Sequence, residues 1–217
     1  GVQCRRAKRT CRRLFQMADF SKSEAKTEQL VMPDELREKL GGGGVSDEGA
    51  LHEGEKKVEE MIAANVPLAD ILSTLVRMIE AQSPGMLCSV LLLSPDGNHI
   101  QHGAAPDLPE HYVKAVDGSP IGPKSGSCGT AMYRGERVVV TDILTDPLWD
   151  DYRDLAKGTD LRACWSTPIL SQRGKVLGSF AMYYMEPQAP SGEEARLTEV
   201  ATRLAAKAIE NQASTGK

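Results

Sequence analysis

Four short apolar runs, paired around two tight turns, constrain the fold of this chain more than any other feature. The runs occupy residues 86–94, 99–105, 162–170 and 176–184. Pro95, Asp96, Gly97 and Asn98 separate the first pair, and a turn at 172–174 separates the second. Extended runs on both sides of an Asp-Gly or glycine-containing turn are typical of β-hairpins. The sequence therefore predicts two hairpins of an antiparallel sheet.

Helical spacing of apolar residues appears on either side of these hairpins. Residues 47–65 are expected to form a polar helix with one apolar side, and Pro67 opens a second helix. The second helix has an apolar stripe at intervals of three and four, formed by Leu68, Ile71, Leu72, Leu75, Val76 and Ile79. A long amphipathic helix is expected at 192–212. Helices near the chain ends and hairpins between them predict an α+β fold on one sheet.

The segment between the hairpins is expected to mix loops, short helices and one strand. We expect short helices at 109–116 and 147–157 and a strand at 137–143. Residues 118–129 contain four glycines and two prolines, so this stretch must bend sharply. It is expected to open into a short helix from about Cys128.

Composition narrows the classes of function. Of 217 residues, 41% are hydrophobic and 26% charged, which permits a packed core. The net charge of −4 argues against a surface that grips nucleic acid throughout. No run approaches the roughly 18 apolar residues of a membrane-spanning helix, and no signal peptide is visible. Five scattered cysteines without a CxxC pair predict reduced thiols and a cytoplasmic location, rather than a zinc site or a disulfide framework.

Four glycines at 41–44 divide the chain. We expect an N-terminal extension or linker at 1–45, partly helical around 11–20 and 33–40, a domain at 46–212 and a tail at 213–217. Six basic residues lie within the first thirteen. They are interpreted as a solvated leader, with DNA binding through this leader as the alternative.

Several motifs in order resemble one known family. They read SVLLLSPDGNHIQHGAAPDLPEHY, GSCGTAMYRGERVVVTDILTDPLWDDYRDLA, LRACWSTPILSQRGKVLGSFAMYY and LTEVATRLAAKAIENQ. Together they resemble GAF domains, above all those of bacterial PAS/GAF sensor histidine kinases and diguanylate cyclases, over roughly residues 60–212. The resemblance implies an antiparallel sheet of five or six strands, with terminal helices on one face. Middle loops and short helices would roof a pocket on the other.

The resemblance also implies a sensory or protein-interaction role without catalysis. Family members bind cyclic nucleotides, haem, bilins or small metabolites, or nothing known, and many dimerise through their terminal helices. We therefore expect a small-molecule sensor of a signal-transduction protein. It would require no cofactor, form a homodimer through its terminal helices and act on an effector domain or kinase elsewhere. A ligand-free dimerisation module is a second interpretation.

The candidate ligand contacts lie between residues 127 and 165. They are Ser127, Cys128, Thr130, Asp142, Trp149, Tyr152, Arg162, Cys164 and Trp165. Gly126–Thr130 could bring backbone amides to an anion at a helix start, or be only a tight turn with a cap. Trp149 and Tyr152 are three apart and would share a helical face, as walls of a pocket or as core.

A redox enzyme is the main rival interpretation. Cys128 matches the CGTA segment of GAF-fold free methionine-(R)-sulfoxide reductases, but Cys164 does not match their later cysteine. The acidic residues of that pattern are absent here, so we expect a thiol that packs as a small apolar side chain. His111 as an axial haem ligand and a bilin near Asp142–Leu144 have weaker support. His99 and His102 are expected on opposite strand faces, which disfavours a shared metal.

Overall fold

The computed structural model describes residues 47–215. The expected extension at 1–45, its helices and basic residues, and the glycine joint lie outside the described residues. The described part is an α+β fold on one five-stranded antiparallel sheet with strand order β2-β1-β5-β4-β3. The strands are β1 (Leu87–Leu93), β2 (Ile100–Ala104), β3 (Val138–Val140), β4 (Ala163–Leu170) and β5 (Val176–Tyr184). The expected fold class is confirmed.

Both predicted hairpins are present. Gly97 turns the first hairpin with a φ of +74°, a left-handed conformation that favours glycine. The second hairpin pairs β4 with β5, and β5 also pairs with β1, so β5 lies at the centre of the sheet. Gly178 permits this close packing, because a Cβ there would collide with the Leu91 carbonyl. The sheet therefore joins the two hairpins through its central strand.

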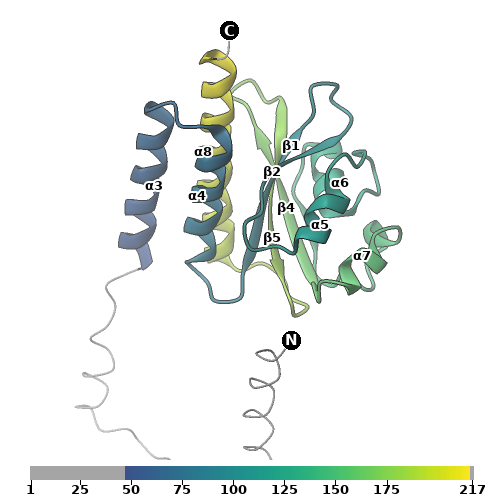
Figure 1. The fold of residues 1–217 in the computed structure, drawn as a ribbon. Helices are drawn as coiled ribbons and strands as arrows, with labels where there is room; N and C mark the ends of the chain where they lie inside the picture. The colour runs from purple at the N-terminus through teal and green to yellow at the C-terminus, as the bar shows by residue number, and fades with distance from the viewer. Residues whose placement is uncertain (1–46, 216–217) are drawn as a thin grey trace, which may run out of the picture. The chain divides into compact units, whose positions relative to one another are not determined.

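Helices α4 (Leu68–Glu80) and α8 (Gly192–Thr215) cover one face of the sheet, and α3 (Asp47–Ala63) packs against these two helices as an outer layer (Figure 1). The predicted stripe of α4 is buried at five positions: Ile71, Leu72, Leu75, Val76 and Ile79. Helix α8 buries Leu197, Ala201, Leu204, Ala205 and Ala208. We call this the helix-side core. It is built from the helical periodicity that the sequence shows.

The opposite face is covered by shorter elements (Figure 1). They are α5 (Glu110–Val116), α6 (Gly126–Arg134), the 3-10 helix η2 (Pro147–Trp149) and α7 (Arg153–Lys157). Their buried side chains meet the other face of β1, β4 and β5 in a second cluster, the pocket-side core.

Three predicted boundaries differ on this face. The continuous helix expected at 147–157 is two short pieces, because the Asp146 carboxylate accepts a hydrogen bond from the Leu148 amide and sets a tight 3-10 turn. The strand expected at 137–143 spans only Val138–Val140, because the Asp142 carbonyl turns back to accept from two later amides. Helix α6 begins at Gly126, two residues earlier than expected.

Candidate functional site

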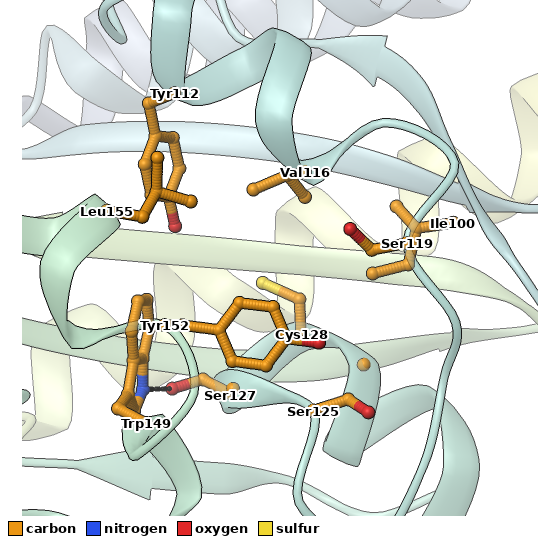
Figure 2. Close-up of a pocket in the computed structure, with 12 residues that line it drawn as sticks. Ile100, Tyr112, Val116, Ser119, Ser125, Ser127, Cys128, Trp149, Tyr152 and Leu155 are labelled. Atoms are coloured by element: carbon orange, nitrogen blue, oxygen red, sulfur yellow. Dashed lines mark hydrogen bonds between the residues drawn. The ribbon is translucent and has the colours of Figure 1, made fainter.

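A pocket lies between the start of α6, helix α5 and the η2–α7 segment (Figure 2). Its cavity volume is about 30 Å³, so its own side chains fill most of it. Twelve described residues line it: Ile100, Tyr112, Val116, Ser119, Ser125, Gly126, Ser127, Cys128, Gly129, Trp149, Tyr152 and Leu155. None of these twelve carries a charged side chain. The pocket is a mixed surface of aromatic rings, aliphatic groups and hydroxyls.

The start of α6 is held in place by its own sequence. Gly126 has a φ of +59°, so the chain can enter the helix through a left-handed residue. The Thr130 hydroxyl accepts a hydrogen bond from the Ser125 amide at 3.0 Å, which closes the loop onto the first turn. Thr130 is fully buried and serves the loop rather than the pocket wall.

Ser127 ties three elements together. Its hydroxyl donates to the carbonyl of Cys164 in β4 at 3.1 Å, and it accepts from the Trp149 indole nitrogen at 3.0 Å (Figure 2). Trp149 is only 3% exposed, so this hydrogen bond satisfies an indole group that water cannot reach. The first turn of α6 is therefore anchored both to the sheet and to η2.

Beneath the pocket, thiols and hydroxyls gather on the sheet. The Cys128 sulfur lies 3.5 Å from the Tyr183 hydroxyl, which lies 3.1 Å from the Ser89 hydroxyl. The Tyr183 ring meets the Tyr112 ring edge to face, with centroids 6.0 Å apart. Cys164 is fully buried beside Cys128, close enough for the two thiols to influence each other's ionisation. We call this group the thiol–hydroxyl cluster.

Two more serines belong to this cluster. The hydroxyls of Ser166 in β4 and Ser179 in β5 are buried, and within residues 47–215 neither makes a hydrogen bond of good geometry. Both face the Cys128 sulfur closely enough to stabilise its thiolate. Unpartnered buried hydroxyls are costly, so native structures hold few of them.

The surroundings of the two thiols shift their pKa values in opposite directions. The nearby Cys164 thiol and the surrounding hydroxyls lower the pKa of Cys128, against the opposing effect of burial. Burial raises the pKa of Cys164, and the neighbouring Cys128 raises it further. Of the two thiols, Cys128 therefore has the surroundings that favour ionisation.

The remaining predicted site residues lie outside the pocket lining. Asp142 and Arg162 form an ion pair with nitrogen–oxygen distances of 3.1–3.2 Å, and the guanidinium holds the pKa of Asp142 below its ordinary value. This pair joins the end of β3 to the start of β4.

Trp165 was predicted to be a ligand contact together with Cys164, but it lies on the opposite face of the sheet. It belongs to the helix-side core, and its indole nitrogen donates to the Gln188 carbonyl. Neighbouring residues of a strand point to opposite faces, so Cys164 and Trp165 cannot share one.

Sequence reasoning missed much of the site. It omitted six lining residues: Ile100 of β2, Tyr112 and Val116 of α5, Ser119 and Ser125 of the loop before α6, and Leu155 of α7. It also omitted the cluster residues of the sheet, which are Ser89, Ser166, Ser179 and Tyr183. One signal was available: each of the three serines interrupts an otherwise apolar strand, and a serine there needs a polar reason.

Across residues 47–215, no group of three or more His, Cys, Asp or Glu side chains is arranged to hold a metal ion. Among the helices described, none combines the length and the apolar character needed to cross a membrane.

Comparison with known proteins agrees with this architecture. A family model described as GAF domain matches residues 66–210. The chain is 38% identical over 157 residues to the methyl sulfide methyltransferase-associated sensor of Methanosarcina acetivorans. That match covers 72% of this chain but only 16% of the relative, so the chain corresponds to a small part of that protein.

Solved structures share the fold at low identity. The GAF domain of a phosphoenolpyruvate-protein phosphotransferase from Coxiella burnetii superposes with a TM-score of 0.62 and 20% identity, covering 79% of this chain and all of that one. The free methionine-R-sulfoxide reductase of Neisseria meningitidis superposes with a TM-score of 0.59 and 16% identity, covering 79% of this chain and 96% of that one. The family model matches residues 66–210, and the order of the strands and the cover on both faces of the sheet agree with that match. This chain therefore belongs to the GAF domain family.

Proposed function

We propose that this GAF domain is the sensory module of a signal-transduction protein and that it binds a small uncharged molecule in the pocket over α6. The observation that carries the proposal is the lining: aromatic and hydroxyl side chains from α5, α6 and η2–α7 converge there, and none of the described lining residues is charged. Ligand sites are mostly apolar with a few placed polar groups. The sensor-named relative supports the sensory role.

The lining also argues for the chemistry of the ligand. No described lining residue offers a cationic side chain to an anion such as a nucleotide phosphate, and the Arg162 side chain is already paired with Asp142 away from the pocket. Trp149 and Tyr152 supply faces for a flat or apolar group, and Ser119 and Ser125 supply hydroxyls. Little of the space admits a whole water molecule, so the ligand is small or enters by moving Tyr152.

A route exists from the pocket to the terminal helices. Residues of β4 and β5 alternate between faces, so Cys164 and Tyr183 face the pocket side while Trp165 and Tyr184 face α8. Tyr184 donates to Glu194 at the start of α8. A ligand that binds two arrangements of this region with different affinity would shift α8 between them, by no more than that difference.

The proposal has three further parts. The domain forms a homodimer through α3 and α8, it lies in the cytoplasm, and it acts on an effector domain or kinase outside this sequence. Ion pairs already join the two helices, at Arg203–Glu55 and Lys207–Glu59. Their outward flanks are mainly polar, so we expect a weak dimer that salt weakens further. Analytical ultracentrifugation in low and high salt tests this, and a monomer in both contradicts it.

The ligand proposal is tested first by native mass spectrometry of the freshly purified full chain, which detects a retained molecule. A thermal-shift series then compares indole and phenol, as neutral aromatic probes, with cyclic GMP. A probe at a hundredfold excess over its Kd stabilises the fold by about 2.7 kcal/mol.

A matched pair of tyrosines provides the control. Tyr152→Ala removes a pocket wall, whereas Tyr133→Ala removes a ring on α6 that is 58% exposed. We expect only the first to abolish the shift. A shift with cyclic GMP alone, or an equal loss in both variants, contradicts a neutral-ligand pocket.

We propose that the domain senses without enzymatic turnover. The structural likeness to a reductase lies below 25% identity and concerns the fold. Sustained reduction of free methionine-(R)-sulfoxide by the purified chain, with a dithiol as reductant, would establish the enzyme instead.

A further inference from the structure

We infer that Cys128 and Cys164 form a dithiol that small hydroperoxides oxidise to a disulfide, with Cys128 as the attacking sulfur. This is a redox site beneath the pocket, and it goes beyond the proposed ligand binding without depending on it. Four observations carry it: the pairing of the two thiols, the polar surroundings of one sulfur, its access from the pocket and the contrast with a third buried cysteine.

The two thiols are brought together by elements that are firmly tied. Cys128 lies in the first turn of α6 and Cys164 in β4, 36 positions later, and the two thiols are near enough to affect each other's pKa. The Ser127 hydroxyl, next to Cys128, donates to the Cys164 carbonyl at 3.1 Å. This bond holds the start of α6 against β4 at the level of the sulfurs. A sulfur–sulfur bond requires two cysteines whose backbones are held near each other.

The Cys128 sulfur is surrounded by groups that donate hydrogen bonds. The Tyr183 hydroxyl lies 3.5 Å away, and the otherwise unpartnered hydroxyls of Ser166 and Ser179 face it. A thiolate accepts hydrogen bonds from hydroxyls more readily than a neutral thiol does. Ionisation of Cys128 would therefore give the buried hydroxyls of Ser166 and Ser179 an acceptor. The position in the first turn of α6 adds the positive end of the helix dipole. These groups favour the nucleophilic thiolate.

Cys128 is also the thiol that the pocket reaches. It lines the pocket and retains 7% exposure, whereas Cys164 has none. Figure 2 shows the Cys128 sulfur among the side chains that border the pocket. A hydroperoxide, which is small and uncharged, fits an uncharged lining that admits only small molecules.

Cys88 provides an internal contrast. It is fully buried in the helix-side core, and burial together with the nearby Glu80 carboxylate raises its pKa. Within residues 47–215, its sulfur has neither solvent access nor hydrogen-bond donors that would stabilise a thiolate. Reactive cysteines occupy accessible sites that favour the thiolate, and buried structural ones are inert.

The reaction balances in two steps. The Cys128 thiolate attacks the outer oxygen of the hydroperoxide, an S–O bond forms as the O–O bond breaks, and the alkoxide leaves and takes up a proton. The sulfur is now a sulfenic acid, oxidised by two electrons. The Cys164 sulfur then attacks the Cys128 sulfur, the S–S bond forms, and hydroxide leaves with the Cys164 proton as water. Overall, two thiols and a hydroperoxide give a disulfide, an alcohol and water.

The test is a peptide map of the full chain after exposure to hydrogen peroxide. Free thiols are alkylated and the protein is digested with trypsin, which places Cys128 in peptide 125–134, Cys164 in peptide 163–173 and Cys88 in peptide 78–114. We expect the first two peptides to be joined, with loss of two hydrogens, and to separate on treatment with dithiothreitol. Cys88 should remain free.

Two single variants assign the attacking sulfur. In Cys164→Ser, dimedone should trap a sulfenic acid on Cys128, whereas Cys128→Ser should show little adduct on Cys164. Ser179→Ala keeps both thiols and removes one donor, and we expect Cys128 to be oxidised about tenfold more slowly. The peptide map of the wild-type protein tests the inference even if a cysteine variant fails to fold.

Several results would overturn the inference. They are a wild-type map without the 128–164 cross-link, adducts that favour Cys164, and oxidation of Cys88 at the same rate as Cys128. None of these measurements uses a pocket ligand. A missing cross-link therefore leaves the neutral-ligand proposal standing, and a missing thermal shift leaves the dithiol standing.

Discussion

The helix-side core and the pocket-side core flank the same sheet but differ in chemistry. The helix side is closed by aliphatic side chains of α3, α4 and α8, with Leu72, Leu75 and Leu204 fully buried. The pocket side places thiols and hydroxyls at the same depth, and at Ser166 and Ser179 their polar groups lack partners of good geometry in the part of the chain described. One face therefore stabilises the domain through apolar packing, whereas the other buries polar groups that reduce its stability, on the side where we propose a ligand and a redox site.

The largest expected effect lies on the helix side. Leu75→Ala removes a side chain with no exposure and leaves a cavity between α4 and the sheet. We expect a loss of about 2–5 kcal/mol in the free energy of unfolding, measured by urea denaturation. Leu170→Ala is the control, because Leu170 is 41% exposed and its loss should cost under about 0.5 kcal/mol. Equal costs would show that the helix side is not the stabilising core.

A smaller effect is expected where the pocket side depends on polar contacts. Trp149→Phe keeps an aromatic ring but deletes the indole N–H that donates to Ser127. We expect a loss of about 1–2 kcal/mol and a weaker thermal shift with indole. Trp165→Phe is the matched control: it deletes an indole hydrogen bond to Gln188 on the other face and should leave the shift with indole unchanged.

The free energy of unfolding should depend on pH through Glu80, the last residue of α4. Burial of the Glu80 carboxyl raises its pKa to about 7, opposed by the hydrogen bond from the Cys88 amide and reinforced by Asp107. The folded state thus binds this proton more tightly than the unfolded chain, whose value is near 4.5. The stability that this group contributes is complete below pH 4.5 and is lost as the pH rises to about 7.

Glu80→Gln tests this assignment. The amide stays neutral and its oxygen can still accept from the Cys88 amide. We expect the fall in melting temperature between pH 5 and pH 8 to shrink in the variant. Arg77, which also interacts with Glu80 and pairs with Asp107, gives a useful second variant, because Arg77→Gln should steepen that fall. An unchanged slope in Glu80→Gln would assign the pH dependence to other groups.

The smallest change in stability is expected within the thiol–hydroxyl cluster. Ser179→Ala removes a buried hydroxyl that lacks a partner of good geometry within the described residues, so we expect the free energy of unfolding to change by about zero to 1 kcal/mol, in the stabilising direction. The same variant should slow oxidation of Cys128. A marked destabilisation would show that Ser179 supports the fold rather than the sulfur.

Much of the fold could be predicted from local patterns. The stripe of α4, the two hairpins and the long α8 each depend on spacing within one segment, and the structure confirms them. The break between η2 and α7 was missed, because the spacing of residues within 147–157 does not determine it. Two hydrogen bonds do: the Asp146 carboxylate accepts from the Leu148 amide, and the Trp149 indole donates to Ser127.

The site was less predictable than the fold. Ser127, Cys128, Trp149 and Tyr152 were predicted together, and the structure brings them to one pocket. Their use as ligand contacts stays a prediction. Trp165 was misplaced although strand alternation alone assigns it to the other face.

By itself, the sequence determined the elements of this protein and which face of each is apolar, because both follow from periodicities of two and 3.6 residues along the chain. Only the tertiary structure decided that Cys128 meets Cys164, Ser166, Ser179 and Tyr183. That meeting requires β5 to lie between β1 and β4 and α6 to cross over them, and such long-range register is set by packing of the whole sheet.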